Sequence, residues 1–276
     1  MQQLKICFLG TGSMGSAVLQ GLVAAGHQTK LISATTRSEE SAARLRAEGI
    51  SALSLESSPD ANELLSSDAD VVVLGVKPYQ IADLLSEIRA ELPKQAVVIS
   101  MAAGIELATM AEKLPDHKNL IRSMPNTPAL VGRGVTGLAA GSEAAPGAIE
   151  IATWLFEAVG EVVEVEEYQI NALSAISGSG PAWMYYLVEK WEQVALANGF
   201  TQDQAATLVR GTLAGSAELL SSSGEEPAEL RRKVTSPGGT TERIIATLEQ
   251  ANLEQLFEAA LEAAVARAKE IAGDKG

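Results

Sequence analysis

From residue 4 to about residue 165, short apolar runs rich in β-branched residues alternate with stretches of helical pattern. This alternation predicts βαβ units, in which crossover helices join parallel strands. The runs at 70–76 and 96–102 are apolar at almost every position, which indicates strands buried on both faces. We therefore expect a parallel-dominated sheet, with strands at 4–10, 30–35, 70–76, 96–102, 119–125, 134–141 and 161–167.

The chain changes character after Glu167. The β-like runs stop, and stretches rich in Ala, Leu and Glu follow at 168–198, 202–222, 227–234 and 240–272. Their pattern predicts helices. A chain of 276 residues is long enough for two domains. We expect an α/β domain at 1–166 and an all-α domain at 167–276, with no Pro/Gly linker between them.

The predicted helix at 202–222 and the last predicted helix are apolar over more than one face. Such a helix has to be buried, and a helical domain of roughly 110 residues offers little protein to bury it in. A partner subunit is the simplest cover, so we expect a homodimer or higher homo-oligomer with the helical domain as its dimerisation domain. Packing within one chain is the alternative. Examples from the last helix are Leu253, Leu256, Phe257, Ala260, Leu261, Ala264 and Val265.

The charge balance argues against polyanionic partners. The formal net charge is -14, and no cluster of Lys and Arg offsets it locally. Nucleic acids and anionic membrane surfaces are therefore disfavoured as partners. A small anionic ligand is still allowed, because backbone N–H groups and one or two cations outweigh a distant negative field.

The single cysteine and the N-terminal sequence bear on the compartment. Cys7 lies in an apolar run and has no second cysteine to pair with, so we expect a small core residue. The first residues show no pattern of a signal peptide, and the apolar runs are shorter than the roughly 20 residues of a membrane helix. We expect a cytoplasmic protein.

A glycine-rich turn follows the first predicted strand and opens a helix. In this context the first glycine allows a tight turn, the second lets a pyrophosphate approach the backbone, and the third allows close packing of helix on sheet. The pyrophosphate then meets free N–H groups at the positive end of the helix dipole. We expect a Rossmann-type dinucleotide-binding domain; a purely structural turn is the alternative. The turn comprises Gly10, Thr11, Gly12, Ser13, Met14 and Gly15.

The end of the second strand bears on which dinucleotide binds. NAD-preferring domains carry an Asp or Glu there, which accepts hydrogen bonds from the ribose. Here the residues are Thr35, Thr36 and Arg37. A guanidinium beside hydroxyl groups suits a 2'-phosphate. We therefore expect NADPH, with NADH possible; Arg37 as a solvated surface charge is the alternative.

Two further segments, 177–182 and 236–241, combine glycines with hydroxyl side chains in the helical half. Such loops at helix starts expose backbone donors, which suits a small carboxylate. Helix-initiating turns with Ser or Thr caps are the alternative.

The chain resembles the pyrroline-5-carboxylate reductase family along essentially its whole length. The resemblance rests on the opening FLGTGSMG, on Val76-Lys77-Pro78, and on the segments 100–104, 122–128, SGSGPA and VTSPGGTT. It implies that NADPH, or less often NADH, delivers hydride to the C=N carbon of 1-pyrroline-5-carboxylate. The product is L-proline, and the reaction is the last step of proline biosynthesis.

The resemblance also assigns roles to residues. It places the substrate carboxylate and ring nitrogen at Ser236, Gly239, Thr240 and Thr241, with Thr241 as the catalytic hydroxyl nearest the nitrogen. It places the cofactor against Asn62, Val76, Lys77, Pro78, Met101, Ala102 and Ala103.

The implied reaction needs few catalytic groups. A protonated cyclic imine is already electrophilic, so the protein mainly has to align the two reactants and exclude water. This is compatible with a chain that has only two histidines. His27 and His117 lie outside the recognised motifs, and we expect both to be exposed.

Three positions depart from the family pattern. Ile244 stands where Gly or Ala is usual, Gly211 where Gln is common, and Gly75 where Ala usually precedes the Val-Lys-Pro turn.

Two other functions stay open. A 3-hydroxyacid dehydrogenase needs a catalytic Lys shortly after the glycine-rich helix start, and the first Lys here is Lys190. A non-catalytic NADPH-binding paralogue is the second.

Overall fold

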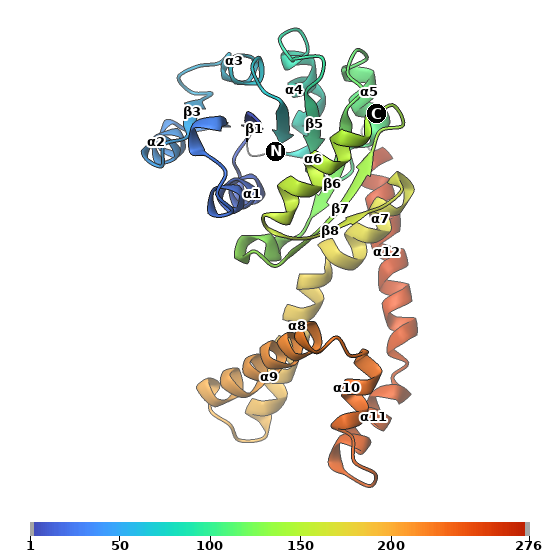
Figure 1. Ribbon diagram of the computed structural model, residues 1–276. Helices are drawn as coiled ribbons and strands as arrows, with labels where there is room; N and C mark the ends of the chain where they lie inside the picture. Colours follow the sequence, from blue (N-terminus) through green and yellow to red (C-terminus); the bar gives the residue numbers. More distant parts are fainter. Residues whose placement is uncertain (1–2, 274–276) are drawn as a thin grey trace. The chain divides into compact units, whose positions relative to one another are not determined.

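The computed structural model describes residues 3–273 (Figure 1). The chain forms two compact units: one runs up to Ser179 and includes the residues from Val265 onward, and the other is Gly180–Ala264. Residues 167–179 belong to the first unit, where Ile170 and Ala175 are buried. The division at residue 167 that the sequence suggests stays a prediction.

The first unit is built on one eight-stranded sheet of order β3-β2-β1-β4-β5-β6-β7-β8. All neighbouring strands are parallel except β6 and β7, which are antiparallel. The expected parallel-dominated sheet is therefore confirmed. The strands are β1 (Ile6–Leu9), β2 (Ile32–Thr36), β3 (Ser51–Ser54), β4 (Val71–Leu74), β5 (Val97–Ser100), β6 (Leu120–Pro125), β7 (Gly134–Ala140) and β8 (Gly160–Glu164).

Helices cover both faces of this sheet. On one face α1, α2 and α6 pack against strand residues such as Phe8 and Val73. On the other face α4, α5 and α7 pack against Leu9 and Val72. The helices of the first unit are α1 (Ser13–Ala24), α2 (Glu39–Ala47), α3 (Ala61–Ser66), α4 (Ile81–Ile88), α5 (Leu107–Lys113), α6 (Pro146–Glu157) and α7 (Ile170–Leu173). Short 3-10 turns lie at Thr29–Leu31, Pro78–Gln80, Thr127–Val131 and Glu167–Gln169, and a π-helical turn at Ser174–Gly178.

The second unit is helical, as expected. Its elements are α8 (Gly180–Ala197), α9 (Gln202–Ser223), α10 (Pro227–Lys233), α11 (Thr240–Gln250) and the first part of α12 (Leu253–Gly273). The prediction of a single helix over 240–272 is wrong, because α11 and α12 are separate helices. The helix breaks before α12 because Asn252 has a φ of 49°, a left-handed conformation that asparagine tolerates.

The second unit buries very little of itself. Between Gly180 and Ala264, only Glu192, Ala205 and Val209 are buried in the single chain. Val209 and Ala205 lie on α9, which packs against α8. Many large apolar side chains of this unit are exposed, among them Tyr185, Leu219 and Phe257. A helical unit with so little core needs further protein to cover it.

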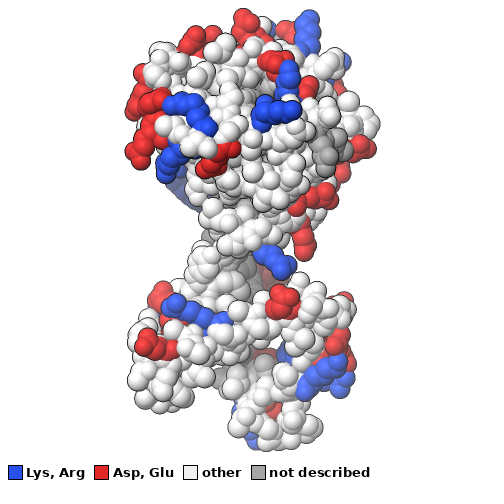
Figure 2. Space-filling view, turned by 60° about the vertical axis from the view of Figure 1, so that its left-hand side comes forward, with Lys and Arg blue, Asp and Glu red and all other residues white. Residues whose placement is uncertain are grey.

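Among residues 3–273, no helix has both the length and the apolar character needed to cross a membrane. On the face shown in Figure 2, basic side chains are scattered between acidic ones and do not form a continuous basic surface.

Candidate cofactor and substrate sites

The candidate cofactor site lies where the strand order reverses. β1 is flanked by β2 on one side and by β4 on the other, so the chain winds outward in both directions from this point. In open α/β sheets, ligands bind at the carboxyl ends of the strands at such a point. The Gly75 N–H donates to the Leu9 carbonyl (2.8 Å), and the Met101 N–H donates to the Leu74 carbonyl (3.2 Å). The loops after β1, β4 and β5 therefore adjoin.

Glycines allow these loops to pack closely. Gly10 has a φ of 89°, which an L side chain rarely adopts. A Cβ on Gly15 would lie 2.7 Å from the Gly10 carbonyl oxygen, and a Cβ on Gly75 would overlap the same oxygen. A Cβ on Gly12, by contrast, would meet no protein atom within 4 Å. Packing within the protein therefore does not require glycine at residue 12. A ligand that approaches the backbone at this residue would require it, because a side chain would be in its way.

The N-terminus of α1 has free donors. Gly12 is its N-cap, and no side chain caps the helix. The first bond within the helix runs from the Ser16 N–H to the Gly12 carbonyl (2.8 Å), so the N–H groups of residues 13–15 have no helical acceptor. Free donors at the positive end of a helix dipole bind phosphate oxygens. The residues present therefore fit a dinucleotide pyrophosphate.

Thr35 supports the glycine turn. Its hydroxyl accepts a hydrogen bond from the Gly10 N–H (3.0 Å), and its carbonyl accepts one from the Thr11 hydroxyl (3.3 Å). Thr36 is buried and donates to the Ser38 carbonyl (2.8 Å). Only Arg37 of the three predicted residues is exposed, and no hydrogen bond or ion pair is recorded for it within residues 3–273.

Acidic side chains also lie near the start of α2. Hydrogen bonds from Arg46 first, and then from Ser54 and Ser57, hold the pKa of Glu39 below its usual range. The charge of Glu39 is therefore compensated within the protein. The Glu56 carboxylate accepts a hydrogen bond from the Glu39 N–H (3.1 Å), so one donor at this helix start is already used. Among Thr35, Thr36 and Arg37, only Arg37 therefore presents an exposed charge with no recorded partner in residues 3–273.

The other predicted cofactor residues lie in three places. Val76 and Met101 lie beside the glycine turn: a Cβ on Gly10 would be 2.8 Å from Val76 Cγ1, and one on Gly75 would be 3.4 Å from Met101 Cε. Asn62 at the start of α3 is buried, and its amide donates to the Glu87 carboxylate (3.1 Å). Lys77, Pro78, Ala102 and Ala103 lie on the loops after β4 and β5.

In the second unit, the predicted substrate loop precedes α11. Gly239 is the N-cap of this helix and no side chain caps it. The loop is closed by a bond from the Gly239 N–H to the Ser236 carbonyl (3.0 Å), and the Gly238 N–H donates to the Glu242 carboxylate (2.9 Å). Ser236 and Thr240 are exposed and Thr241 is half-buried. The free N–H groups of the first turn suit a carboxylate.

The segment 177–182 is not the loop that the sequence suggests. A π-helical turn at Ser174–Gly178 leads almost directly into α8. The Asn126 side chain donates to the Ser177 carbonyl (3.0 Å), and the Ser177 hydroxyl is buried without a partner. Glycine at residue 178 lets Ser174 and Met124 approach closely. Such π-turns within helices are frequent at functional sites.

The expectation that both histidines are exposed is wrong. His27 is 4% and His117 is 6% exposed. In each ring Nε2 lies within hydrogen-bond distance of a backbone carbonyl, Leu4 (3.0 Å) for His27 and Leu92 (3.2 Å) for His117. Burial lowers the pKa of His27. The polar surroundings of these histidines in the sequence gave no sign of carbonyl partners that lie more than 20 residues away.

Cys7 is a core residue, as expected. It is fully buried on β1, and burial raises the pKa of its thiol to about 12. Such a thiol is almost entirely protonated at neutral pH and is a poor nucleophile.

A buried polar cluster was not predicted from the sequence. Arg122 on β6 is 3% exposed and donates to the Glu167 carboxylate (3.3 Å) and to the Asn171 side chain (3.2 Å). Glu167 also accepts a hydrogen bond from the Leu107 N–H (2.6 Å). This cluster joins β6 and the start of α5 to the segment that leads into the π-turn. Arg122 begins the quoted segment 122–128, which is the only signal for it in the sequence.

Comparison with known proteins agrees with both halves of the chain. The family profile described as pyrroline-5-carboxylate reductase dimerisation matches residues 167–271. A second profile, described as NADP oxidoreductase coenzyme F420-dependent, matches residues 5–104. The chain is 36% identical to a pyrroline-5-carboxylate reductase of Methanosarcina acetivorans, over 98% of this chain and 99% of the relative. For the enzyme of Vibrio alginolyticus the identity is 39%, over 98% of both chains.

Solved structures give the same result. A pyrroline-5-carboxylate reductase from Coxiella burnetii is 36% identical, with a TM-score of 0.91 over 97% of this chain and 98% of that one. A pyrroline carboxylate reductase from Plasmodium falciparum, solved with NADP bound, is 26% identical, with a TM-score of 0.82 over 99% of both chains. The chain belongs to the pyrroline-5-carboxylate reductase family.

Proposed function

We propose that this chain is a pyrroline-5-carboxylate reductase that makes L-proline with NADPH, in the last step of proline biosynthesis. The observation that carries the proposal is the end-to-end similarity to proteins of that name, at 36% to 39% identity over at least 98% of this chain. NADPH supplies a hydride to the imine carbon, and the ring nitrogen keeps its proton and becomes a secondary amine. NADH remains a possible second donor.

The first unit would hold the cofactor. The uncapped start of α1 and the open backbone at Gly12 suit the pyrophosphate. Thr35 would act by holding the turn, since its hydroxyl already accepts the Gly10 N–H. Arg37 would meet the 2'-phosphate with charge-assisted hydrogen bonds.

The second unit would hold the substrate. The first turn of α11 offers N–H donors to the carboxylate, with Ser236, Gly239 and Thr240 around it. Thr241 would place its hydroxyl at the ring nitrogen and orient the imine for hydride transfer. Ile244 lies one turn further on and is 60% exposed, so its bulk does not close this loop in the single chain.

The chain assembles as a homo-oligomer through its dimerisation domain. Its partners are a small-molecule substrate and further copies of itself. The exposed apolar side chains of α8, α9, α11 and α12 would form the surface that such an assembly covers. A cytoplasmic location stays a prediction from the sequence.

The two rival functions have less support. A 3-hydroxyacid dehydrogenase needs a lysine with a lowered pKa to act as a base. Lys190 is exposed, and its hydrogen bond with Glu189 raises its pKa. A non-catalytic paralogue needs no substrate site, so it does not account for the uncapped N-terminus of α11.

The test is a turnover assay with racemic 1-pyrroline-5-carboxylate and each reduced nicotinamide cofactor in turn. We expect loss of nicotinamide absorbance with formation of L-proline, faster with NADPH than with NADH. NADPH binding without turnover would establish the non-catalytic paralogue instead. Oxidation of 3-hydroxyacids with NADP, in the absence of imine reduction, would establish the dehydrogenase.

A further inference from the structure

Asn62 and Glu87 form a hydrogen-bonded pair between two helices of the first unit. The Asn62 amide nitrogen lies 3.1 Å and 3.4 Å from the two carboxylate oxygens of Glu87. Asn62 lies in the first turn of α3 and is 6% exposed. Glu87 lies near the end of α4, which packs against α3. The family resemblance places Asn62 at the cofactor and assigns no role to Glu87.

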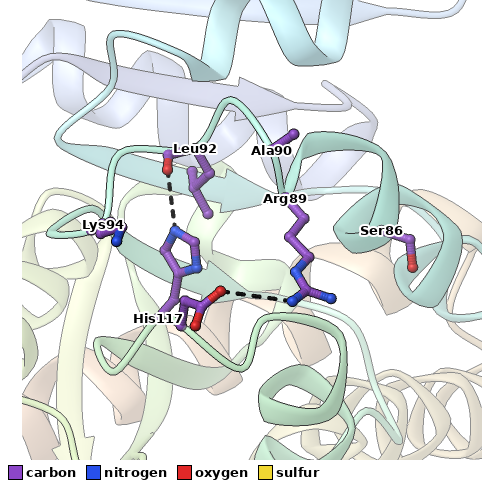
Figure 3. Close-up of a pocket in the computed structure, with 7 residues that line it drawn as sticks. Ser86, Arg89, Ala90, Leu92, Lys94 and His117 are labelled. Carbon is purple, nitrogen blue, oxygen red and sulfur yellow. Dashed lines mark hydrogen bonds and ion pairs between the residues drawn. The ribbon is translucent and has the colours of Figure 1, made fainter.

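The Glu87 carboxylate has no cation as its partner. No ion pair is recorded for it within residues 3–273. Arg89, the nearest cation along the chain, extends instead into a surface hollow, where its guanidinium lies 3.7 Å from the Asp116 carboxylate (Figure 3). In the described part of the chain, both hydrogen bonds recorded for the Glu87 carboxylate come from Asn62. The amide of Asn62 is therefore what this carboxylate acts on.

The carboxylate fixes the direction in which the Asn62 amide points. An ionised carboxylate only accepts hydrogen bonds, so it takes the NH2 group of the amide and repels the amide oxygen. Oδ1 of Asn62 is thereby turned away from Glu87. The buried side-chain atoms that lack a partner among residues 3–273 are Nδ1 of His27, Nδ1 of His117 and the Ser177 hydroxyl oxygen. Oδ1 of Asn62 is not one of them and accepts no recorded hydrogen bond, so it reaches the surface as a free acceptor.

Asn62 lies at the edge of the sheet that holds the cofactor turns. β2 and β3 are parallel, and the Leu55 N–H just after β3 donates to the Thr36 carbonyl at the end of β2 (2.9 Å). A short hydrogen-bonded turn then leads into α3, which packs against β1 and β2. In Rossmann-type domains the adenosine ribose is recognised at the end of the second strand. A free acceptor at this place suits a ribose hydroxyl.

We propose that Glu87 is a positioning residue for the cofactor: it holds the Asn62 amide so that Oδ1 accepts a hydrogen bond from the 3'-hydroxyl of the adenosine ribose. The assignment rests on the proposed function, since it takes a nicotinamide dinucleotide as the ligand. The charged oxygens of a 2'-phosphate do not donate, so Oδ1 cannot bond to them. The 3'-hydroxyl is common to NADPH and NADH. Glu87 therefore strengthens the binding of both cofactors alike, whereas Arg37 distinguishes between them.

Glu87→Gln in the full-length protein is the first variant. Glutamine has nearly the same shape, and its amide pairs with Asn62 in either orientation, so Oδ1 is no longer fixed toward the ribose. We expect NADPH and NADH to bind about three- to tenfold more weakly, which corresponds to the loss of one hydrogen bond. Glu91→Gln is the matched control, because it removes the same charge from an exposed residue just beyond α4. Fluorescence titration with the reduced cofactors measures these affinities without turnover.

A modified cofactor separates positioning from a role in folding. NADH that lacks the 3'-hydroxyl of its adenosine ribose has lost the donor that Oδ1 takes. This analogue should bind the parent and Glu91→Gln about three- to tenfold more weakly than NADH does. Glu87→Gln should bind the two ligands with affinities that agree within about twofold, because the interaction is already lost. If Glu87 served folding alone, the response to the missing hydroxyl would be the same in all three proteins.

Exchanging the two side-chain types gives a rescue. When Asn62→Asp is combined with Glu87→Gln, the introduced glutamine donates to the introduced aspartate, whose second oxygen still faces the ribose as an acceptor. We expect the affinity for NADH, and its dependence on the 3'-hydroxyl, to return. The affinity for NADPH should not recover, because the new carboxylate repels the 2'-phosphate.

The assignment is overturned if the parent binds both forms of NADH alike, or if Glu87→Gln behaves like Glu91→Gln. It is also overturned if the double variant does not regain the response to the 3'-hydroxyl. A parent that binds and oxidises NADPH but gives one of these results would leave the proposed function standing and remove only the role of Glu87. A parent that binds neither cofactor would overturn the proposed function and this assignment together.

Discussion

At the scale of single residues, the Gly10 carbonyl oxygen is the atom that constrains the cofactor turn most tightly. It lies against Cα of Gly15 and Cα of Gly75, with no room for a Cβ on either. The family resemblance of the sequence leads us to expect Ala at the position of Gly75. An alanine therefore fits here only if the turn moves away from the loop after β4. Glycine at residue 75 lets the loop after β4 approach the glycine turn closely.

Gly75→Ala tests how tightly the protein packs at the cofactor turn, and Gly12→Ala tests whether the cofactor approaches the backbone there. Gly75→Ala should destabilise the fold by about 1 to 3 kcal/mol, as overpacking does, and lower the melting temperature. Gly12→Ala should leave the melting temperature nearly unchanged, because its Cβ meets no protein atom, but should weaken NADPH binding at least about tenfold. Thermal melts and cofactor titrations measure both. An unchanged NADPH affinity in Gly12→Ala would show that the pyrophosphate does not pass there.

Arg37→Ala should reduce the preference for NADPH. The guanidinium is exposed and without a recorded partner in residues 3–273, so its loss leaves the fold intact. We expect NADPH to bind more weakly by an amount that corresponds to about 1.5 to 3 kcal/mol, the range for a hydrogen bond to a charged group. NADH, which has no 2'-phosphate, should be little affected. Equal losses for both cofactors would contradict the role of Arg37.

Thr241→Ala should lower kcat and leave NADPH binding nearly unchanged, because the proposed role of its hydroxyl concerns only the substrate. Thr247→Ala on the same helix is the matched control. The Thr247 hydroxyl donates to the Arg243 carbonyl (2.9 Å), a bond within the helix. Steady-state kinetics and a cofactor titration measure the two effects. If both variants turn over like the parent, Thr241 has no catalytic role.

At the scale of elements, the Arg122 cluster ties the sheet to the helical segment that follows β8. Arg122→Gln should destabilise the fold by about 2 kcal/mol or more, since it leaves the Glu167 carboxylate without its cation. Glu167 is one-third exposed, so the loss should be below the full value for a buried pair. Arg133→Gln, an exposed arginine, is the control. Denaturant unfolding measures both, and an equal effect in the two variants would rule out a structural role for the ion pair.

The elements that the sequence predicted well are those with a local signal. The strands β4 and β5 are buried on both faces and are apolar at almost every position. β3 was missed because it is a four-residue edge strand with two serines. The break at Asn252 was missed because the helical pattern continues on both sides of it.

The same distinction between local signals and long-range contacts applies to the candidate site. The glycine turn is a local motif and could be predicted from spacing alone. The hydrogen bond from Gly10 to Thr35 and the carbonyl partner of His117 join residues 25 positions apart. Contacts of this kind arise from the tertiary fold, and no pattern within either segment indicates them.

At the scale of the whole molecule, the helical unit cannot account for its own stability. Apolar burial is the main favourable term in folding, and this unit buries three residues between Gly180 and Ala264. We expect its exposed leucines, tyrosines and phenylalanines to become buried when a second copy covers them. We therefore expect folding of this unit to be coupled to assembly, so that its stability rises with protein concentration.

Leu219 and Leu64 allow a matched test of this coupling. Both are exposed leucines on helices, 56% on α9 and 58% on α3, one in each unit. Leu219→Glu should dissociate the oligomer, because a carboxylate in an apolar interface loses its hydration without a partner. Leu64→Glu should leave the oligomer intact, because the first unit has its own core. Light scattering after size-exclusion chromatography gives the two masses, to be compared with the 28.8 kDa of one chain. An intact oligomer in Leu219→Glu would mean that Leu219 on α9 lies outside the interface. Dissociation by Leu64→Glu as well would mean that the effect is not specific to α9.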